Sequence, residues 1–283
     1  MKWITLDPGY PGIRRAEDLG AGTAIPDFWN SFMGKTQQNQ VNTARMVRIV
    51  FCSALPQEIQ FLGRWLGVRI PSYGPWTIQE KTVFGQAVIL AVSGMGRERM
   101  SRLLSALGDQ PVDYWISLGY AGGLDPVLKA GDILEGTTVR TRRGDILAYG
   151  QGEKVLAAGS PILVCAEEVI LTPQEKWELH ERTGGMAVDM ESAAVAAHAS
   201  SRQEPFVWIR VISDAVTETV PPVLLQCVDS EGFPSVRAAI RGLVRNPFGM
   251  PVLVRHAWRS RRYGQRLAER AVRWLERFRG EGD

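Results

Sequence analysis

The stretch Tyr114-Trp115-Ile116-Ser117-Leu118-Gly119-Tyr120-Ala121-Gly122-Gly123 decides the fold class, because it joins a strand signal to a glycine-rich segment. Residues 114–118 are mostly apolar and predict a buried strand, whereas the glycines of 119–123 predict a turn that ends it. Glycine lets a ligand approach the backbone N–H groups closely, so this segment is a candidate border of a binding site. Taken alone, it could equally be a tight turn.

Strands and helices alternate on both sides of that stretch. Apolar runs typical of buried strands occur at residues 47–51, 87–92 and 206–212. Helical spacing of apolar residues predicts helices that begin at Pro56, after Gly96 and at Pro173, and an alanine-rich helix over 191–199. This alternation predicts an α/β sandwich with helices on both faces of the sheet.

Residues 1–45 differ from the rest of the chain. Glycine-rich and polar runs such as 35–40 break any long periodicity, and Met46 directly precedes the first predicted strand. We therefore expect an irregular N-terminal extension over 1–45 that is dispensable for the fold. One domain is expected over 46–283.

The overall composition is typical of a cytoplasmic globular protein. No run approaches the ~18 apolar residues of a membrane span, and the N-terminus lacks the apolar core of a secretory signal. A net charge of +3 is too small to suggest nucleic-acid binding. Widely spaced cysteines favour reduced thiols, and histidines without ligand spacing argue against a metal site and against a histidine-centred triad.

A second glycine-rich turn follows the predicted strand at 87–92. Gly94-Met95-Gly96-Arg97-Glu98-Arg99 begins like a dinucleotide-binding motif, but Arg99 stands where the third glycine is required. We therefore interpret this segment as a strand-to-helix turn and expect no dinucleotide cofactor.

Three acidic residues each follow a predicted strand, namely Glu58, Glu191 and Asp214. Strand ends gather around one crevice in α/β sheets, so these carboxyl groups are candidates for a shared site. Cleavage of the bond between a ribosyl C1′ and a purine nitrogen needs a proton donor at the base, groups that hold the ribosyl hydroxyls, and an oriented nucleophile. Each acid could equally be a helix-start residue that interacts with the helix dipole.

Five sequence blocks together resemble the nucleoside phosphorylases and the methylthioadenosine/S-adenosylhomocysteine nucleosidases, over about residues 47–216. The blocks are Ala-Leu-Pro-Gln-Glu at 54–58, Ser-Gly-Met-Gly at 93–96, the glycine-rich segment 119–132, Val-Asp-Met-Glu-Ser-Ala-Ala at 188–194 and Arg-Val-Ile-Ser-Asp at 210–214. The resemblance implies a three-layer αβα sandwich around a mixed, twisted central sheet. It also implies a homo-oligomer that cleaves a purine nucleoside without a metal or other cofactor.

This resemblance implies a role for each candidate site residue. Asp214 would be the general acid that protonates N7 of the leaving purine, and Ser213 would help to hold it. Glu191 would accept hydrogen bonds from the 2′- and 3′-hydroxyls, with Met190 against the sugar, while Glu58 would orient or deprotonate a water molecule. The border of the pocket would comprise Gly119, Tyr120, Ala121 and Gly122. An aspartate at 214, rather than an asparagine, resembles enzymes that act on 6-aminopurines such as adenine.

A narrower similarity points to the hopanoid-associated branch of this superfamily. It rests on Lys176 in Thr-Pro-Gln-Glu-Lys at 172–176, on the block 187–192, on Val-Pro-Pro at 220–222 and on the arginine-rich C-terminus. This similarity implies removal of adenine from adenosylhopane.

The sequence departs from the hexameric phosphorylases at two positions. Those enzymes hold phosphate with an arginine and a serine, where this chain has Ser117 and Tyr120. Loss of a bidentate cation removes most of the reason for phosphate to bind, which favours hydrolysis. The alternatives are phosphorolysis, with inorganic phosphate as co-substrate near Arg97 or Arg99, and a nucleoside-binding protein without turnover.

The C-terminal segment combines arginines with an apolar stripe. Leu267, Ala271, Trp274, Leu275 and Phe278 fall on one helical face, and arginines occur throughout residues 255–279. Such a helix could pack on the domain with a solvated basic face. Alternatively, it could contact anionic lipid at the inner face of the membrane. Nucleic-acid binding lacks any accompanying motif.

Overall fold

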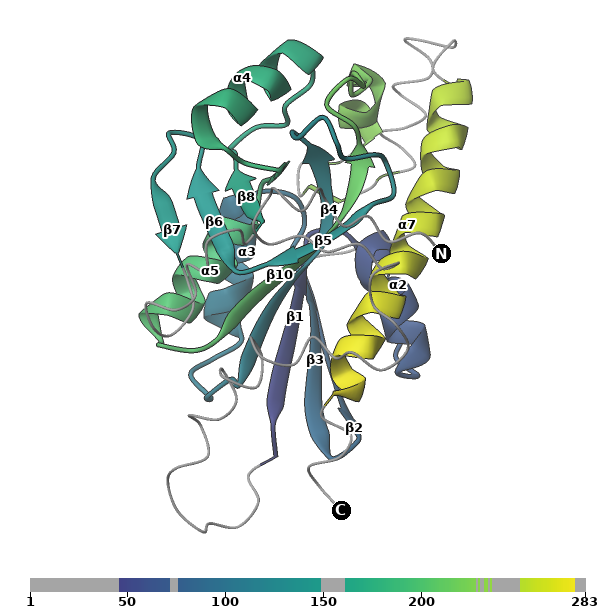
Figure 1. Ribbon diagram of the computed structural model, residues 1–283. Helices are drawn as coiled ribbons and strands as arrows, with labels where there is room; N and C mark the ends of the chain where they lie inside the picture. Colours follow the sequence, from purple (N-terminus) through teal and green to yellow (C-terminus); the bar gives the residue numbers. More distant parts are fainter. Residues whose placement is uncertain are drawn as a thin grey trace, which may run out of the picture.

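The computed structural model describes residues 46–71, 76–148, 161–227, 229, 232–233, 235 and 250–277 (Figure 1). The predicted extension over 1–45 lies outside the described residues. So does Phe278, the last residue of the predicted apolar stripe.

Within the described residues, one sheet contains ten strands. They are β1 (Arg48–Ser53), β2 (Thr77–Val83), β3 (Gln86–Val92), β4 (Tyr114–Gly123), β5 (Ile133–Gly136), β6 (Thr138–Thr141), β7 (Ile146–Ala148), β8 (Ile162–Cys165), β9 (Ala187–Asp189) and β10 (Phe206–Asp214). The α-helices are α2 (Pro56–Trp65), α3 (Arg97–Ala106), α4 (Pro173–Thr183), α5 (Ser192–Ser201) and α7 (Met250–Glu276), and a 3-10 helix spans Pro222–Cys227.

The sheet is mixed, and β4 lies at its centre. β4 pairs in parallel with β1 and with β10, and its last two residues pair antiparallel with β9. β2 is antiparallel to β3, and β5 is antiparallel to β10. β1, β9 and β10 are therefore all direct neighbours of β4.

The glycine-rich segment 119–123 belongs to β4, so the prediction that it forms a turn is wrong. Its residues pair with β10 from Gly119 to Gly122 and with β9 at Gly122 and Gly123. β10 supplies hydrogen-bond partners along one edge, and β9 supplies them at the last two residues of the other edge. This pairing outweighs the low strand propensity of glycine. β10 likewise continues past residue 212 to Asp214, with a register irregularity between Ile212 and Asp214.

Alternate residues of the central strands face two separate apolar cores, as in a sheet covered on both sides. Val50 and Cys52 of β1 belong to the core that contains residues of α3 and α5. Ile49 and Phe51 belong to the core that contains residues of α2 and α7. Figure 1 shows α2 and α7 together on one side of the sheet, and α3 with α5 on the other. The predicted three-layer α/β architecture with a mixed sheet is confirmed.

Helix α4 begins and ends at strong local signals. At its start, the Thr172 hydroxyl accepts a hydrogen bond from the Glu175 N–H at 3.3 Å, and the Glu175 carboxylate accepts one from the Thr172 N–H at 2.9 Å. Such a capping box satisfies N–H groups that have no partner inside the helix. At its end, Gly184 adopts the left-handed conformation with φ of 64°. These caps set where α4 begins and ends, and Lys176 lies on its buried face with Leu179 and Thr183.

The predicted basic C-terminal helix is α7, and the buried residues among its described side chains lie in its second half. Leu267, Ala271, Trp274 and Leu275 pack into the core shared with α2. Gly264 allows the close crossing, because a Cβ there would lie 2.4 Å from the Gln57 carbonyl oxygen. Near the start of α7, Val254 and Trp258 are 60% and 70% exposed. None of the described helices is long and apolar enough to cross a bilayer.

Candidate active site

The three predicted acids come from three different elements around the end of β4. Glu58 lies in the first turn of α2, Glu191 precedes α5, and Asp214 is the last residue of β10. A Cβ on Gly119 would lie 2.9 Å from Glu58 Oε1, and one on Gly122 would lie 3.4 Å from Asp214 Oδ2. The absence of a side chain at Gly119 therefore lets the Glu58 carboxyl group approach the strand, whereas the distance at Gly122 is an ordinary van der Waals contact.

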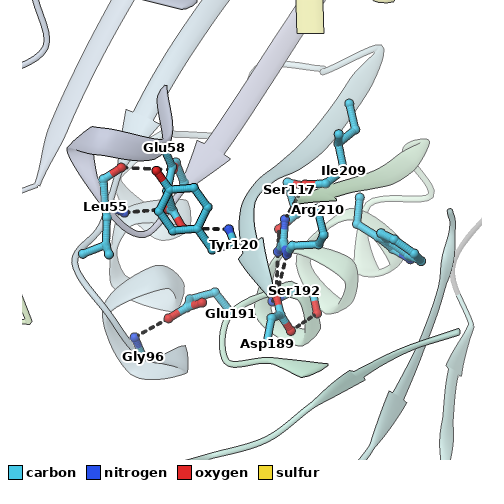
Figure 2. Close-up of polar contacts among 12 residues, drawn as sticks. Leu55, Glu58, Gly96, Ser117, Tyr120, Asp189, Glu191, Ser192, Ile209 and Arg210 are labelled. Carbon is cyan, nitrogen blue, oxygen red and sulfur yellow. Dashed lines mark hydrogen bonds and ion pairs between the residues drawn. The ribbon is translucent and has the colours of Figure 1, made fainter. Parts of the chain in front are cut away.

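Glu58 is a buried carboxylate with three hydrogen-bond donors. Oε2 accepts from the Ser53 hydroxyl at 2.7 Å and from the Leu55 N–H at 2.8 Å, and Oε1 accepts from the Tyr120 N–H at 2.9 Å. Burial raises the pKa of Glu58. The three hydrogen bonds and the nearby positive charge of Arg210 oppose that rise. A helix-start role explains only the contact with Leu55. The contact with Tyr120 joins Glu58 to β4 and fixes its position at the site (Figure 2).

Glu191 is tied to the turn that precedes α3. Its Oε1 accepts a hydrogen bond of 2.6 Å from the Gly96 N–H (Figure 2). Burial, followed by the negative charge of Asp189, raises the pKa of Glu191 to about 8. These surroundings favour the protonated form of the carboxyl group, which can both donate and accept hydrogen bonds. The Gly94–Gly96 turn thus positions a carboxyl group, and the Gly96 N–H is occupied by it.

Arg210 is a buried cation between these two acids. It is 2% exposed and forms an ion pair of 2.5 Å with Asp189, which also accepts a hydrogen bond of 2.6 Å from the Ser192 hydroxyl. A guanidinium has five N–H donors. All of them are used here, by Asp189 Oδ2 at two nitrogens and by Ser117 O, Ser117 Oγ and Ile209 O (Figure 2). The charge of Arg210 opposes the rise in pKa that burial causes at both Glu58 and Glu191.

Asp214 is held from two sides and remains partly accessible. Oδ2 accepts from the Lys176 ammonium at 2.5 Å, and Oδ1 accepts from the Ser213 hydroxyl. The Ser213 hydroxyl also lies 3.2 Å from the Ala121 carbonyl oxygen. The Asp214 side chain is 17% exposed, whereas Lys176 is fully buried. Asp214 can therefore meet a ligand, and Lys176 cannot.

The remaining predicted residues contribute in different ways. Met190 is half-buried immediately before Glu191. Tyr120 contributes its backbone N–H to Glu58, but its hydroxyl donates to the Ser260 carbonyl of α7 at 2.9 Å. The phenol of Tyr120 therefore anchors α7 instead of facing the acids.

The sequence reasoning assigned no role to Arg210, Asp189 or Lys176. Two signals could have found Arg210 and Lys176. Arg210 is a charged residue inside an apolar strand, and Lys176 shares the buried face of α4 with Leu179 and Thr183. A charge at a core position needs a partner, which is a reason to search for one.

Residues 48–162 and 160–224 match the phosphorylase superfamily. The chain belongs to this superfamily. It is 26% identical over 203 residues to the 5′-methylthioadenosine/S-adenosylhomocysteine nucleosidase of Colwellia psychrerythraea, an alignment that covers 59% of this chain and 84% of the relative. It is 29% identical over 198 residues to the nucleosidase of the same name from Baumannia cicadellinicola, covering 57% and 83%. The chain is thus a distant relative of these nucleosidases.

Solved structures confirm the fold. The 5′-methylthioadenosine/S-adenosylhomocysteine nucleosidase of Campylobacter jejuni superposes with a TM-score of 0.56 at 16% identity, over 82% of this chain and 99% of that one. Futalosine hydrolase of Helicobacter pylori superposes with a TM-score of 0.52 at 20% identity, over 61% and 87%. At these identities the likeness concerns the fold alone. The relatives and solved structures named above do not show membership of the hopanoid-associated branch, which stays a prediction.

Proposed function

We propose that this protein hydrolyses the N-glycosidic bond of an adenosyl nucleoside and releases adenine. The observation that carries the proposal is the convergence of Glu58, Glu191 and Asp214 on the end of β4, each held by specific donors. The distant identity to methylthioadenosine/S-adenosylhomocysteine nucleosidases supports adenine as the leaving base.

Each acid takes a separate part in the reaction. Asp214, the accessible acid, protonates N7 and so neutralises the charge that develops on the leaving purine. Glu191 binds the ribosyl 2′- and 3′-hydroxyls, with Met190 against the sugar. Glu58 keeps one lone pair of Oε1 for a water molecule, because its other contacts leave that position unused. Water then attacks C1′ as the C1′–N9 bond breaks.

The contacts of Arg210, Ser117 and Gly96 favour water over phosphate as the nucleophile. All N–H donors of Arg210 are engaged within the protein, so it has none to offer to a phosphate. The Gly96 N–H is likewise engaged, by Glu191, and the Ser117 hydroxyl is buried and accepts a hydrogen bond from Arg210. Of the two candidates for phosphate binding on α3, Arg99 donates to the Met95 carbonyl at 3.1 Å, and Arg97 is exposed. Phosphorolysis of the same bond is the alternative outcome of the experiment below.

We extend the proposal to a substrate with a membrane-embedded tail, adenosylhopane, and to a homo-oligomeric cytoplasmic enzyme. The exposed residues of α7 support contact with anionic lipid. Val254 and Trp258 lie one helical turn apart, with the exposed Arg255, Arg261 and Arg262 near them. Flotation with anionic vesicles at low salt tests this contact, and a Trp258→Ala variant should float less. Protein that stays at the bottom would remove the membrane role.

Adenine release tests the catalytic proposal directly. We would incubate the protein with methylthioadenosine, S-adenosylhomocysteine and an adenosylhopane extract in phosphate-free buffer, and then with added phosphate. Release without phosphate supports hydrolysis, and release only with phosphate supports phosphorolysis. The Asp214→Asn variant separates catalysis from mere binding. We expect it to bind adenine and to lose turnover. Ligand binding without release by the native protein would indicate a binding protein.

A further inference from the structure

Lys176 is a fully buried ammonium whose hydrogen bonds are all made at the end of β10. Its Nζ donates to Asp214 Oδ2 at 2.5 Å, to the Ala215 carbonyl at 2.9 Å and to the Glu218 carbonyl at 2.6 Å. An ammonium group has three N–H donors and no acceptor. Every donor of Lys176 therefore has a partner, which is the condition under which a buried charge is tolerated.

These contacts make the two oxygens of Asp214 unequal. Oδ2 faces a group that can only donate. Oδ1 faces the Ser213 hydroxyl, which can donate to Oδ1 or instead to the Ala121 carbonyl oxygen 3.2 Å away. A proton on Oδ2 would point at the ammonium protons of Lys176, whereas a proton on Oδ1 requires only that the Ser213 hydroxyl turns toward Ala121.

We propose that Lys176 is a positioning residue that reserves Oδ2 and makes Oδ1 the oxygen that protonates the purine. The inference rests on the proposed function, in which Asp214 is the general acid. In the step itself, the Oδ1–H bond breaks and its electron pair stays on Oδ1, while N7 gains the proton. The electrons of the C1′–N9 bond pass to the purine. Lys176 keeps its three protons throughout.

The charge of Lys176 then has a direct effect on the rate. As Asp214 gives up its proton, negative charge develops on a carboxyl group that already lies 2.5 Å from an ammonium group. A preorganised cation at the place where charge develops stabilises the transition state without any rearrangement. Lys176 acts entirely through Asp214, because it is fully buried and cannot touch the substrate.

Four variants test this inference. Lys176→Met keeps the length and apolar stem of the side chain and removes the charge, and Lys176→Gln keeps an N–H donor without the charge. Leu179→Ala perturbs the same buried face of α4 without touching Asp214, so it reports a purely structural effect. Asp214→Asn removes the general acid. Thermal melting identifies the variants that fold, and Lys176→Gln takes the place of Lys176→Met if the latter does not.

We expect Lys176→Met to lower kcat for adenine release by about 10- to 100-fold, with KM changed by no more than about threefold, since part of the general-acid contribution is lost. Lys176→Gln should be intermediate, and folded Leu179→Ala should keep the native kcat. The double variant Lys176→Met/Asp214→Asn should be no slower than Asp214→Asn, because both changes remove the same effect.

The possible failures are distinguishable. If the native protein releases no adenine from any adenosyl compound, the proposed function fails, and this inference fails with it. If the native protein is active and Lys176→Met keeps its kcat, only the inference is overturned. A double variant slower than Asp214→Asn by the full factor of Lys176→Met would also overturn it, because Lys176 would then act independently of Asp214.

Discussion

Replacement of Arg210 by methionine tests the buried ion pair between the acids. The variant would leave Asp189 buried, with the hydroxyl and N–H of Ser192 as its remaining donors. Removal of one partner of a buried ion pair costs about 3–5 kcal/mol. We therefore expect the free energy of unfolding to fall by that amount. At ~2–4 °C per kcal/mol for a domain of this size, the melting temperature should fall by roughly 6–20 °C.

Urea unfolding followed by tryptophan fluorescence measures this loss. The matched control is Arg102→Met, because Arg102 pairs with Glu98 at 2.5 Å but is 72% exposed. An exposed pair contributes about 0–1 kcal/mol, so the control should be nearly as stable as the native protein. Arg210→Met/Asp189→Asn removes both charges and should recover much of the loss. A loss below about 1 kcal/mol for Arg210→Met, or no recovery in the double variant, would show that the stability of the protein does not depend on this buried ion pair.

Three further predictions concern the acids. Glu58→Gln should lower kcat by about 100-fold or more with an unchanged circular dichroism spectrum, and a native rate would show that Glu58 does not orient the nucleophile. Gly119→Ala should also lower kcat, because its Cβ would lie 2.9 Å from Glu58 Oε1; steady-state adenine release checks this, and an unaffected rate would count against the tight approach. The pKa of Glu191 lies at about 8, above its usual 4.5, so the folded state prefers the protonated form. Stability from this group is present below pH 4.5 and is lost as the pH rises through about 8. In urea unfolding across that pH range, the free energy of unfolding should fall less for Glu191→Gln than for the native protein. Parallel curves of this free energy against pH would contradict the raised pKa.

Most of the architecture could be predicted because the central strands are continuously apolar. β3 is buried along its whole length, so its sequence alone marks a strand covered on both faces. β2 has the opposite character, with exposed polar residues at most positions, and it is a strand only because β3 offers it an edge. β6, β7 and β8 have three or four residues each, too few to establish a periodicity.

The candidate site could likewise be predicted only in part. Glu58, Glu191 and Asp214 follow strands, so their common location could be predicted from the topology of α/β sheets. The partners of these acids could not. Lys176 reaches Asp214 from a separate helix, 38 residues away in the chain, and Arg210 meets Asp189 across 21 residues. Such contacts depend on how elements pack, which local sequence patterns do not specify.

The central claim is that water, and not phosphate, attacks C1′ when adenine leaves. The most direct measurement is adenine release in phosphate-free buffer made with ¹⁸O-labelled water, followed by mass spectrometry of the ribosyl product. We expect release with one ¹⁸O atom at C1′, and loss of that release in Asp214→Asn. Release that requires phosphate and yields a ribosyl 1-phosphate would contradict the claim.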